Sequence, residues 1–85
     1  MNISILRIGV FLQERPNGLG VMVICKDSNM TVKELIQKAK SQFGEEANTY
    51  DTIALYPAYE RIPHDSNVFD ALRDRYKMIL LDSSK

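Results

Sequence analysis

The sequence predicts a single small α+β domain in which one mixed β-sheet packs against one main helix. Three observations favour this class. An apolar run at 19–26 leads directly into a strongly signalled helix at 32–43. Further short apolar runs, separated by turn-forming residues, lie on both sides of that unit. The length of 85 residues leaves room for one sheet and one or two helices, so we expect 1–85 to form one domain.

The main helix has the clearest local signals. Thr31 and Glu34 form a Ser/Thr-x-x-Glu capping box, in which each side chain satisfies a backbone N–H of the first helical turn. Met30 and Leu35 are spaced to form the hydrophobic contact that often flanks such a cap. Gly44 supplies the left-handed residue that commonly ends a helix. The apolar residues that we expect to face the core recur at helical spacing: Val32, Leu35, Ile36, Ala39 and Phe43.

Two apolar runs before this helix predict a hairpin. The run 3–12 is followed by turn-forming residues at 15–18, and 19–26 forms the return strand. The first strand has apolar residues on both faces, so either both faces of the sheet are partly covered or a bulge after Ile5 shifts the register. One face has Leu6, Ile8, Val10 and Leu12, and the other has Ile3, Ile5 and Phe11.

After the helix we expect three further strands and a short helical turn. The polar segment 45–50 is expected to be a linker, and 82–85 is expected to fray. Pro57 ends the first of these strands because proline cannot donate to the hydrogen-bond ladder. The turn-rich residues 63–67 can cap the helical turn. The expected ranges are 52–56, 59–62 and 76–81 for the strands and 67–73 for the helical turn.

Two longer patterns bear on the family of the protein. The first begins in the second strand and runs along one side of the helix, and the second spans the helical turn and enters the last strand. The first is Val23-Ile24-Cys25-Lys26-Asp27 followed by Met30-x-Val32-x-Glu34-Leu35-x-Gln37-x-Ala39, and the second is Ile62-x-x-Asp65-x-x-Val68-x-Asp70-Ala71-Leu72 followed by Lys77-Met78-Ile79.

Over essentially the whole chain, the order of elements resembles the ubiquitin-like superfamily. This implies a β-grasp roll: a mixed sheet of four to five strands packed on one main helix, plus a short helical turn. The two patterns resemble one family more closely, the N-terminal oligomerisation domain of the partitioning-defective (Par) polarity scaffolds, which is related to the Phox-and-Bem-type modules. Domains of that family associate front to back into filaments.

The resemblance implies a non-catalytic scaffold domain that self-associates front to back through complementary charged faces. It also implies a cytoplasmic location at the cytoskeleton or cell cortex and a role in cell polarity. By position, Met22 matches an exposed apolar residue of the family, and Asp74 matches an acid before its last strand. The basic residues of the family before the second strand are replaced here by 18–20, and the hairpin is longer. The expected association residues are Arg7, Arg15, Met22, Lys26, Asp65, Asp70 and Asp74.

The charge and hydropathy of the sequence argue against two classes of partner, nucleic acids and membranes. The net charge is zero, but residues 1–43 have six basic and three acidic side chains, whereas 44–85 has five basic and eight acidic ones. This balance argues against nucleic acid, which needs a concentrated basic face. The sequence has no apolar run long enough to cross a bilayer, and 2–12 does not have the pattern of a signal peptide. We therefore expect a cytoplasmic protein with protein partners and no membrane insertion.

The sequence does not predict a catalytic site. His64 is the sole histidine and lies in a predicted turn, and Cys25 is the sole cysteine and lies in an apolar strand, where packing is its expected role. The glycines at 18–20 are not followed by a helix, so they predict a hairpin turn and not a phosphate loop. Zinc would need ligands that this sequence does not have. We expect no enzyme activity, cofactor or metal.

Three kinds of protein binding remain open. The first is front-to-back self-association, with an apolar centre at Met22. The second is binding of a Ras-family GTPase, in which the exposed second strand pairs with a partner strand and Lys26 and Arg7 contact acidic residues. The third is packing as one lobe of a larger scaffold protein, through apolar residues such as Ile5 and Phe11. We rank self-association first.

Overall fold

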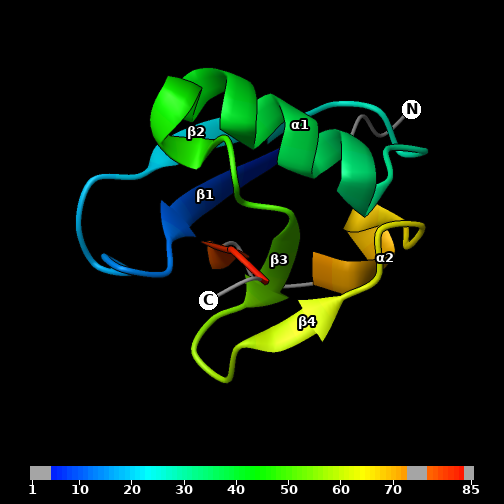
Figure 1. Ribbon diagram of the computed structural model, residues 1–85. Coiled ribbons are helices and arrows are strands. Elements are labelled where there is room, and N and C mark those ends of the chain that lie inside the picture. Colours follow the sequence, from blue (N-terminus) through cyan, green and yellow to red (C-terminus); the bar gives the residue numbers. More distant parts are fainter. Residues whose placement is uncertain (1–4, 73–76, 84–85) are drawn as a thin grey trace.

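The computed structural model describes residues 5–72 and 77–83, which form a five-stranded sheet with one long helix lying across it (Figure 1). A 3₁₀ helix, η1, and a short helix, α2, complete the described elements. In chain order the elements are β1 (Leu6–Leu12), β2 (Val21–Cys25), α1 (Val32–Phe43), η1 (Gly44–Ala47), β3 (Thr52–Leu55), β4 (Glu60–Ile62), α2 (Val68–Leu72) and β5 (Lys77–Leu81).

The sheet is mixed, with its strands in the order β2-β1-β5-β3-β4. β1 and β5 are parallel, whereas the other neighbouring pairs are antiparallel. β2 and β4 are therefore the two edge strands. A mixed five-stranded sheet with one main helix and a short second helix confirms the predicted α+β class and has the β-grasp arrangement.

α1 begins and ends at the residues that the sequence predicts. Thr31 and Glu34 form the predicted capping box at its start. Gly44 ends the helix at φ 81°, a conformation that costs little without a Cβ, and its N–H donates to the Lys40 carbonyl oxygen. The buried face of α1 consists of Val32, Leu35, Ile36 and Ala39.

Apolar side chains cover both faces of the sheet, as one of the two alternatives for the first strand predicted. The β1–β2 pairing is continuous from Leu6 opposite Cys25 to Val10 opposite Val21, and it contains no bulge. The larger cluster, on the α1 side, includes Ile8, Val10, Val23, Leu35, Ile53, Leu72, Met78 and Leu80. The smaller cluster, on the outer face, consists of Ala54, Ile79 and Leu81 with Phe11 and Tyr56 packed against them.

The outer cluster is closed by a lysine and by the loop between β1 and β2. The Lys77 ammonium lies 4.0 Å from the ring centroid of Tyr56 and 4.7 Å from that of Phe11. It also donates a hydrogen bond of 2.9 Å to Asn17 Oδ1 in the loop. The backbone of Gly20 lies against the Phe11 ring. Part of the outer face is therefore covered although none of the described helices lies on it.

The described strands are shorter than the predicted ones. β1 begins at Leu6, and Ile5 lies outside it and is exposed, while residues 3 and 4 fall outside the described part. β2 begins only at Val21, so the predicted start at residue 19 is wrong. β3 ends one residue early, and β4 starts one residue late because Tyr59 has a φ of 58°, which strand backbone does not adopt. Residues 73 and 76, at the ends of the predicted helical turn and last strand, are also outside the described part.

Two segments predicted to be irregular are instead tied to the core. The expected linker 45–50 contains η1, and its Ala47 and Tyr50 are buried. Asp82 and Ser83 do not fray: Gln13 accepts the N–H of Asp82, and Asp51 accepts that of Ser83. The physical reason is tertiary, because both segments gain partners that are distant in sequence.

We predict that Gly20→Ala destabilises the protein. A Cβ at this position would lie 2.6 Å from the Phe11 ring and 2.7 Å from the Val10 carbonyl oxygen. Such overlap should lower the free energy of unfolding by about 1–3 kcal/mol, measured by urea denaturation. Gly18→Ala is the matched control, since its Cβ would meet only the Arg15 side chain, at 3.1 Å. Equal losses in the two variants would contradict the close approach at Gly20.

The second prediction concerns Asp51, whose carboxylate accepts hydrogen bonds from the Ser83 hydroxyl at 2.6 Å and the Ser83 N–H at 3.1 Å. The Ser83 hydroxyl and N–H lower the pKa of Asp51 below its ordinary value of 3.8. A lowered folded-state pKa adds stability above the ordinary value, and this stability is lost as the pH falls through the folded pKa.

We therefore expect the wild type to be more stable than Asp51→Asn at pH 6, with a difference that shrinks as the pH falls below 3.8, the ordinary pKa of the carboxyl group. Urea denaturation of both proteins over a pH series measures this difference. A difference that stays constant down to the acid limit would contradict the role of the carboxylate charge.

Candidate functional site

The first candidate surface lies on the outer face of β2 and β1. Arg7 is directly opposite Ile24, and Gly9 is opposite Met22, so these residues share a face of the sheet. Met22 is 53% exposed and Ile24 49% exposed. Lys26 follows β2 and is exposed. We call Arg7, Met22, Ile24 and Lys26 the β2 surface: two apolar side chains with both basic side chains at the Ile24 end.

The edge of β2 is partly covered by α1. The side-chain amide of Gln42 donates a hydrogen bond of 3.0 Å to the Met22 carbonyl oxygen. This carbonyl group therefore points away from β1, towards the open edge of the sheet. Edge strands commonly protect their backbone groups from unwanted strand pairing, and Gln42 does so here. The outer face of β2 is thus more open than its edge.

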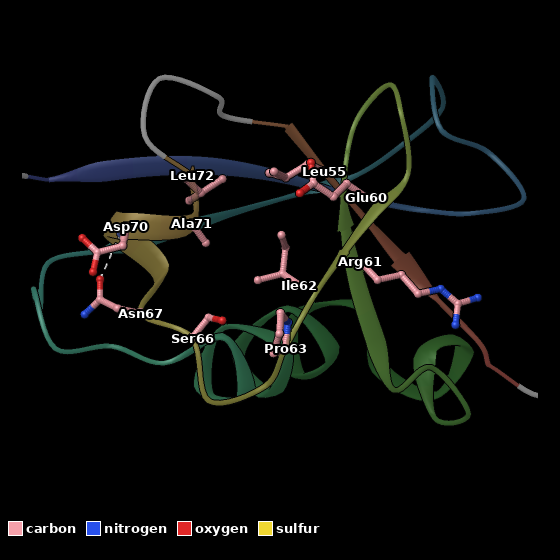
Figure 2. Close-up of a pocket in the computed structure, with 10 residues that line it drawn as sticks. All are labelled: Leu55, Glu60, Arg61, Ile62, Pro63, Ser66, Asn67, Asp70, Ala71 and Leu72. Carbon is pink, nitrogen blue, oxygen red and sulfur yellow. Dashed lines mark hydrogen bonds between the residues drawn. The ribbon is translucent and has the colours of Figure 1, made fainter.

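The second candidate surface is a groove of about 630 Å³ between β4 and α2 (Figure 2). Its floor is apolar and includes the buried side chains of Leu55, Ile62 and Leu72. The exposed carboxylates of Glu60 and Asp70 lie on its rim. Figure 2 shows Arg61 extended away from α2. The complete lining is Leu55, Glu60, Arg61, Ile62, Pro63, Ser66, Asn67, Asp70, Ala71 and Leu72. We call this the β4–α2 groove.

Asn67 holds one wall of the groove in place. Its amide nitrogen donates a hydrogen bond of 2.6 Å to the Ser28 carbonyl oxygen. Its amide oxygen accepts the Asp70 N–H at 3.1 Å, which is the geometry of a helix N-cap for α2. The predicted cap within 63–67 is thereby confirmed. Because Asn67 bonds to both segments, it joins α2 to the chain just before α1.

The two surfaces lie on opposite sides of the domain. β2 and β4 are the two edges of the sheet, separated by β1, β5 and β3. Figure 1 shows β2 under one end of α1, and β4 and α2 at the far side of the fold. The two surfaces therefore cannot meet within one molecule.

The structure brings some of the predicted site residues together. Arg7, Met22 and Lys26 all belong to the β2 surface. Asp70 lies on the groove rim, and Asp65 is exposed in the loop just before α2. The other two predicted residues are Arg15, which lies in the β1–β2 loop in a salt bridge with Glu46, and Asp74, which lies outside the described residues.

Sequence reasoning missed Ile24 and Glu60. Strand alternation could have found Ile24, because it is two residues from Met22 and points to the same face. Glu60 had no such signal. It reaches the groove rim because β4 pairs with β3 next to α2, an arrangement that depends on long-range contacts.

The sole cysteine and the sole histidine each contact backbone groups of nearby segments. Burial raises the pKa of the Cys25 thiol, whose sulfur lies 3.7 Å from the Asp27 carbonyl oxygen, so the reactive thiolate is disfavoured. His64 is exposed, its Nε2 lies 2.7 Å from the Asp51 carbonyl oxygen, and its own carbonyl oxygen accepts the Lys33 N–H. Both residues hold local structure in place.

The described residues contain neither a metal-binding cluster nor a membrane-spanning helix. Within 5–72 and 77–83 there is no group of three or more His, Cys, Asp or Glu side chains placed to hold a metal ion. In the same residues no helix has the length and apolar character needed to span a membrane. No known protein-family model matches this sequence, and no curated protein matches it closely.

We predict that Asn67→Ala destabilises the protein by about 1–2 kcal/mol, because both amide hydrogen bonds are lost and α2 loses its cap. Urea denaturation measures the loss. Ser41→Ala, at an exposed position on α1, is the control and should change the stability by less than about 0.5 kcal/mol. If the two variants were equally stable, Asn67 could not be the link between α2 and the Ser28 segment.

Proposed function

We propose that this protein is a non-catalytic protein–protein interaction module that self-associates front to back. The β2 surface of one copy is the front, and the β4–α2 groove of the next copy is the back. The single observation that carries the proposal is the complementary character of these two surfaces at opposite edges of the sheet.

Charge complementarity supports this pairing. The front has the basic residues Arg7 and Lys26, while Glu60, Asp65 and Asp70 lie on or beside the back. Opposite charges on two such surfaces steer encounter, fix the register and disfavour front-to-front contact. The zero net charge of the whole chain is compatible with many copies packing closely.

Apolar complementarity supplies affinity. Met22 and Ile24 are exposed on the front, and the lining of the back includes apolar side chains such as Ile62. Burying apolar surface contributes roughly 25 cal/mol per Å² removed from water. Specific interfaces commonly combine an apolar core with a polar rim.

The geometry of the pairing favours an open assembly. The two contacting patches differ, so each copy that joins leaves one front and one back exposed. Such contacts produce a filament unless the rotation between copies closes a ring. The resemblance of 23–43 and 62–79 to the Par oligomerisation domain supports the same assembly. We extend the proposal to the role of that family as a scaffold in cell polarity, in the cytoplasm at the cytoskeleton or cortex.

A second candidate function is strand pairing at the β2 edge, the mode expected for a GTPase partner. β2 is an edge strand, which favours it. However, a partner strand would have to displace the Gln42 amide from the Met22 carbonyl group. The third reading, a packed lobe, is weakened because Phe11 packs within its own domain. Capture of a GTPase in only one nucleotide state, with Asp70→Lys binding as well as wild type, would favour the second candidate.

Light scattering behind size-exclusion chromatography tests the proposal over a concentration series at low and high salt. We expect the mass to rise with concentration from the monomer value of 9.7 kDa and to fall back in about 1 M salt, where charges are screened within about 3 Å. A constant monomer mass at every concentration would overturn self-association.

Charge reversals then locate the two faces. Arg7→Glu removes the front and Asp70→Lys removes the back, so each variant alone should remain monomeric. An equimolar mixture should associate again, because each variant retains the surface that the other has lost. Lys33→Glu and Glu45→Lys are matched reversals at exposed positions outside both surfaces, and they should associate as wild type does.

A further inference from the structure

The basic side chains of the β2 surface gather beside one of its two apolar residues. Arg7 lies directly opposite Ile24, and Lys26 follows Ile24 by two residues and is exposed. Met22 lies opposite Gly9, which offers no side chain. Side chains that lie directly opposite each other on a sheet have Cβ atoms about 4.5–5.5 Å apart, so Ile24 has a basic neighbour that Met22 lacks. Of the two apolar residues, Ile24 is therefore the one next to both basic side chains.

These two basic side chains are available to another molecule. Within residues 5–72 and 77–83, neither Arg7 nor Lys26 forms a salt bridge. Asp27 is next to Lys26 in sequence, but its carboxylate accepts the Asn29 N–H at 2.8 Å and is held in the loop after β2. The charge beside Ile24 is therefore open to an acidic partner surface.

The positive charge nearest to Met22 along the sheet is already engaged. On the side of β1 away from β2, Gly9 pairs with Lys77 of β5. The Lys77 ammonium lies over the rings of Phe11 and Tyr56, where it closes the outer cluster. Met22 therefore lies on the side of the β2 surface towards the covered part of the sheet, and Ile24 lies on the side away from it.

The β4–α2 groove has the complementary pattern. Glu60 and Asp70 are exposed on its rim, and among the described residues neither forms a salt bridge. In the view of Figure 2, the apolar residues Ala71 and Leu72 lie between these two acids, and Arg61 extends away from α2. The groove thus has an apolar lining with two acidic side chains beside it.

We infer that Ile24 is the apolar anchor of the front and enters the β4–α2 groove of a second copy. This inference rests on the proposed front-to-back association and places its centre at Ile24, where the family resemblance implied Met22. Two basic side chains beside an isoleucine match two acidic side chains beside an apolar lining, and this charge complementarity favours a second copy as the occupant. Because β2 is an edge strand, no further strand of its own sheet separates Ile24 from an approaching groove.

A defined pair of variants tests the inference. Arg7→Glu keeps an intact back and Asp70→Lys keeps an intact front, so their mixture should form a dimer with a single front-to-back contact. Ile24→Thr, Met22→Thr or Ile24→Val is then added to Asp70→Lys, which supplies the front. Isothermal titration calorimetry of each combination against Arg7→Glu measures the affinity of that one contact.

The three added substitutions should differ in effect. Ile24→Thr should weaken binding by about tenfold or more, as expected for a central anchor. Met22→Thr should bind within about threefold of the parent pair, and so should Ile24→Val, which retains an apolar side chain. Threonine is well accepted in strands and both positions are about half exposed, so the urea midpoints of the threonine variants should stay close to that of Asp70→Lys.

A cross-link tests the contact directly. We expect Ile24→Cys in Asp70→Lys and Ala71→Cys in Arg7→Glu to form a disulfide-linked heterodimer under mild oxidation, because Ala71 lines the groove. Glu45→Cys, outside the groove, replaces Ala71→Cys in the control, which should form little heterodimer. The native Cys25 can remain because its thiol is buried.

The outcomes separate this inference from the function on which it rests. If the pair associates but Met22→Thr weakens it as much as Ile24→Thr does, or if the cross-link is no more abundant than in the control, Ile24 is not the anchor and the front-to-back proposal stands. If the wild type associates but the pair does not, the assignment of the two faces is wrong, and so is this inference. If neither associates at any concentration, self-association itself falls. A selective loss with Ile24→Thr together with the specific cross-link supports the inference.

Discussion

The fold depends on a hydrogen-bonded seam between two segments that are distant in sequence, 28–33 and 63–68. The Val32 N–H donates to Ser66 and the Val68 N–H donates to Met30, both at 2.9 Å. The Lys33 N–H and the Asn67 amide add two further bonds across the seam. Backbone N–H groups at the start of α1 have no partners within the helix, so the seam satisfies groups that would otherwise need water. Because the same seam positions α2 beside β4, it also creates the groove.

The outer face of the sheet has a covered part and an exposed part. One half is closed by Lys77, Phe11 and Tyr56 and by the loop between β1 and β2. The other half, around Met22 and Ile24, is open. A helix already covers the opposite face, so the open half is where the sheet can contact another molecule. The covering loop thereby limits the β2 surface.

The order of the strands makes the two edges of the sheet chemically different. Because β2 and β4 are opposite edges, the β2 surface, with its basic and apolar side chains, and the acid-rimmed groove lie at opposite edges of one sheet. The β2 edge itself is protected by Gln42, which favours contact through the face over strand pairing. These two features, the different ends and the protected edge, are the ones on which the proposed front-to-back contact relies, since edge pairing would compete with it.

The sequence by itself determined the α+β class and the full extent of α1, because caps, helical spacing and a terminal glycine act within one or two turns of the chain. It also indicated that Met22 is exposed, since alternation along a strand is local, whereas Arg7 and Lys26 were predicted from their charge. Only the tertiary structure decided where β2 begins, that η1 forms, that the backbone of 82–83 is hydrogen-bonded to distant side chains, and that Glu60 lies on the rim of a groove. These features depend on partners that are distant in sequence, and no local pattern specifies which distant residues will meet.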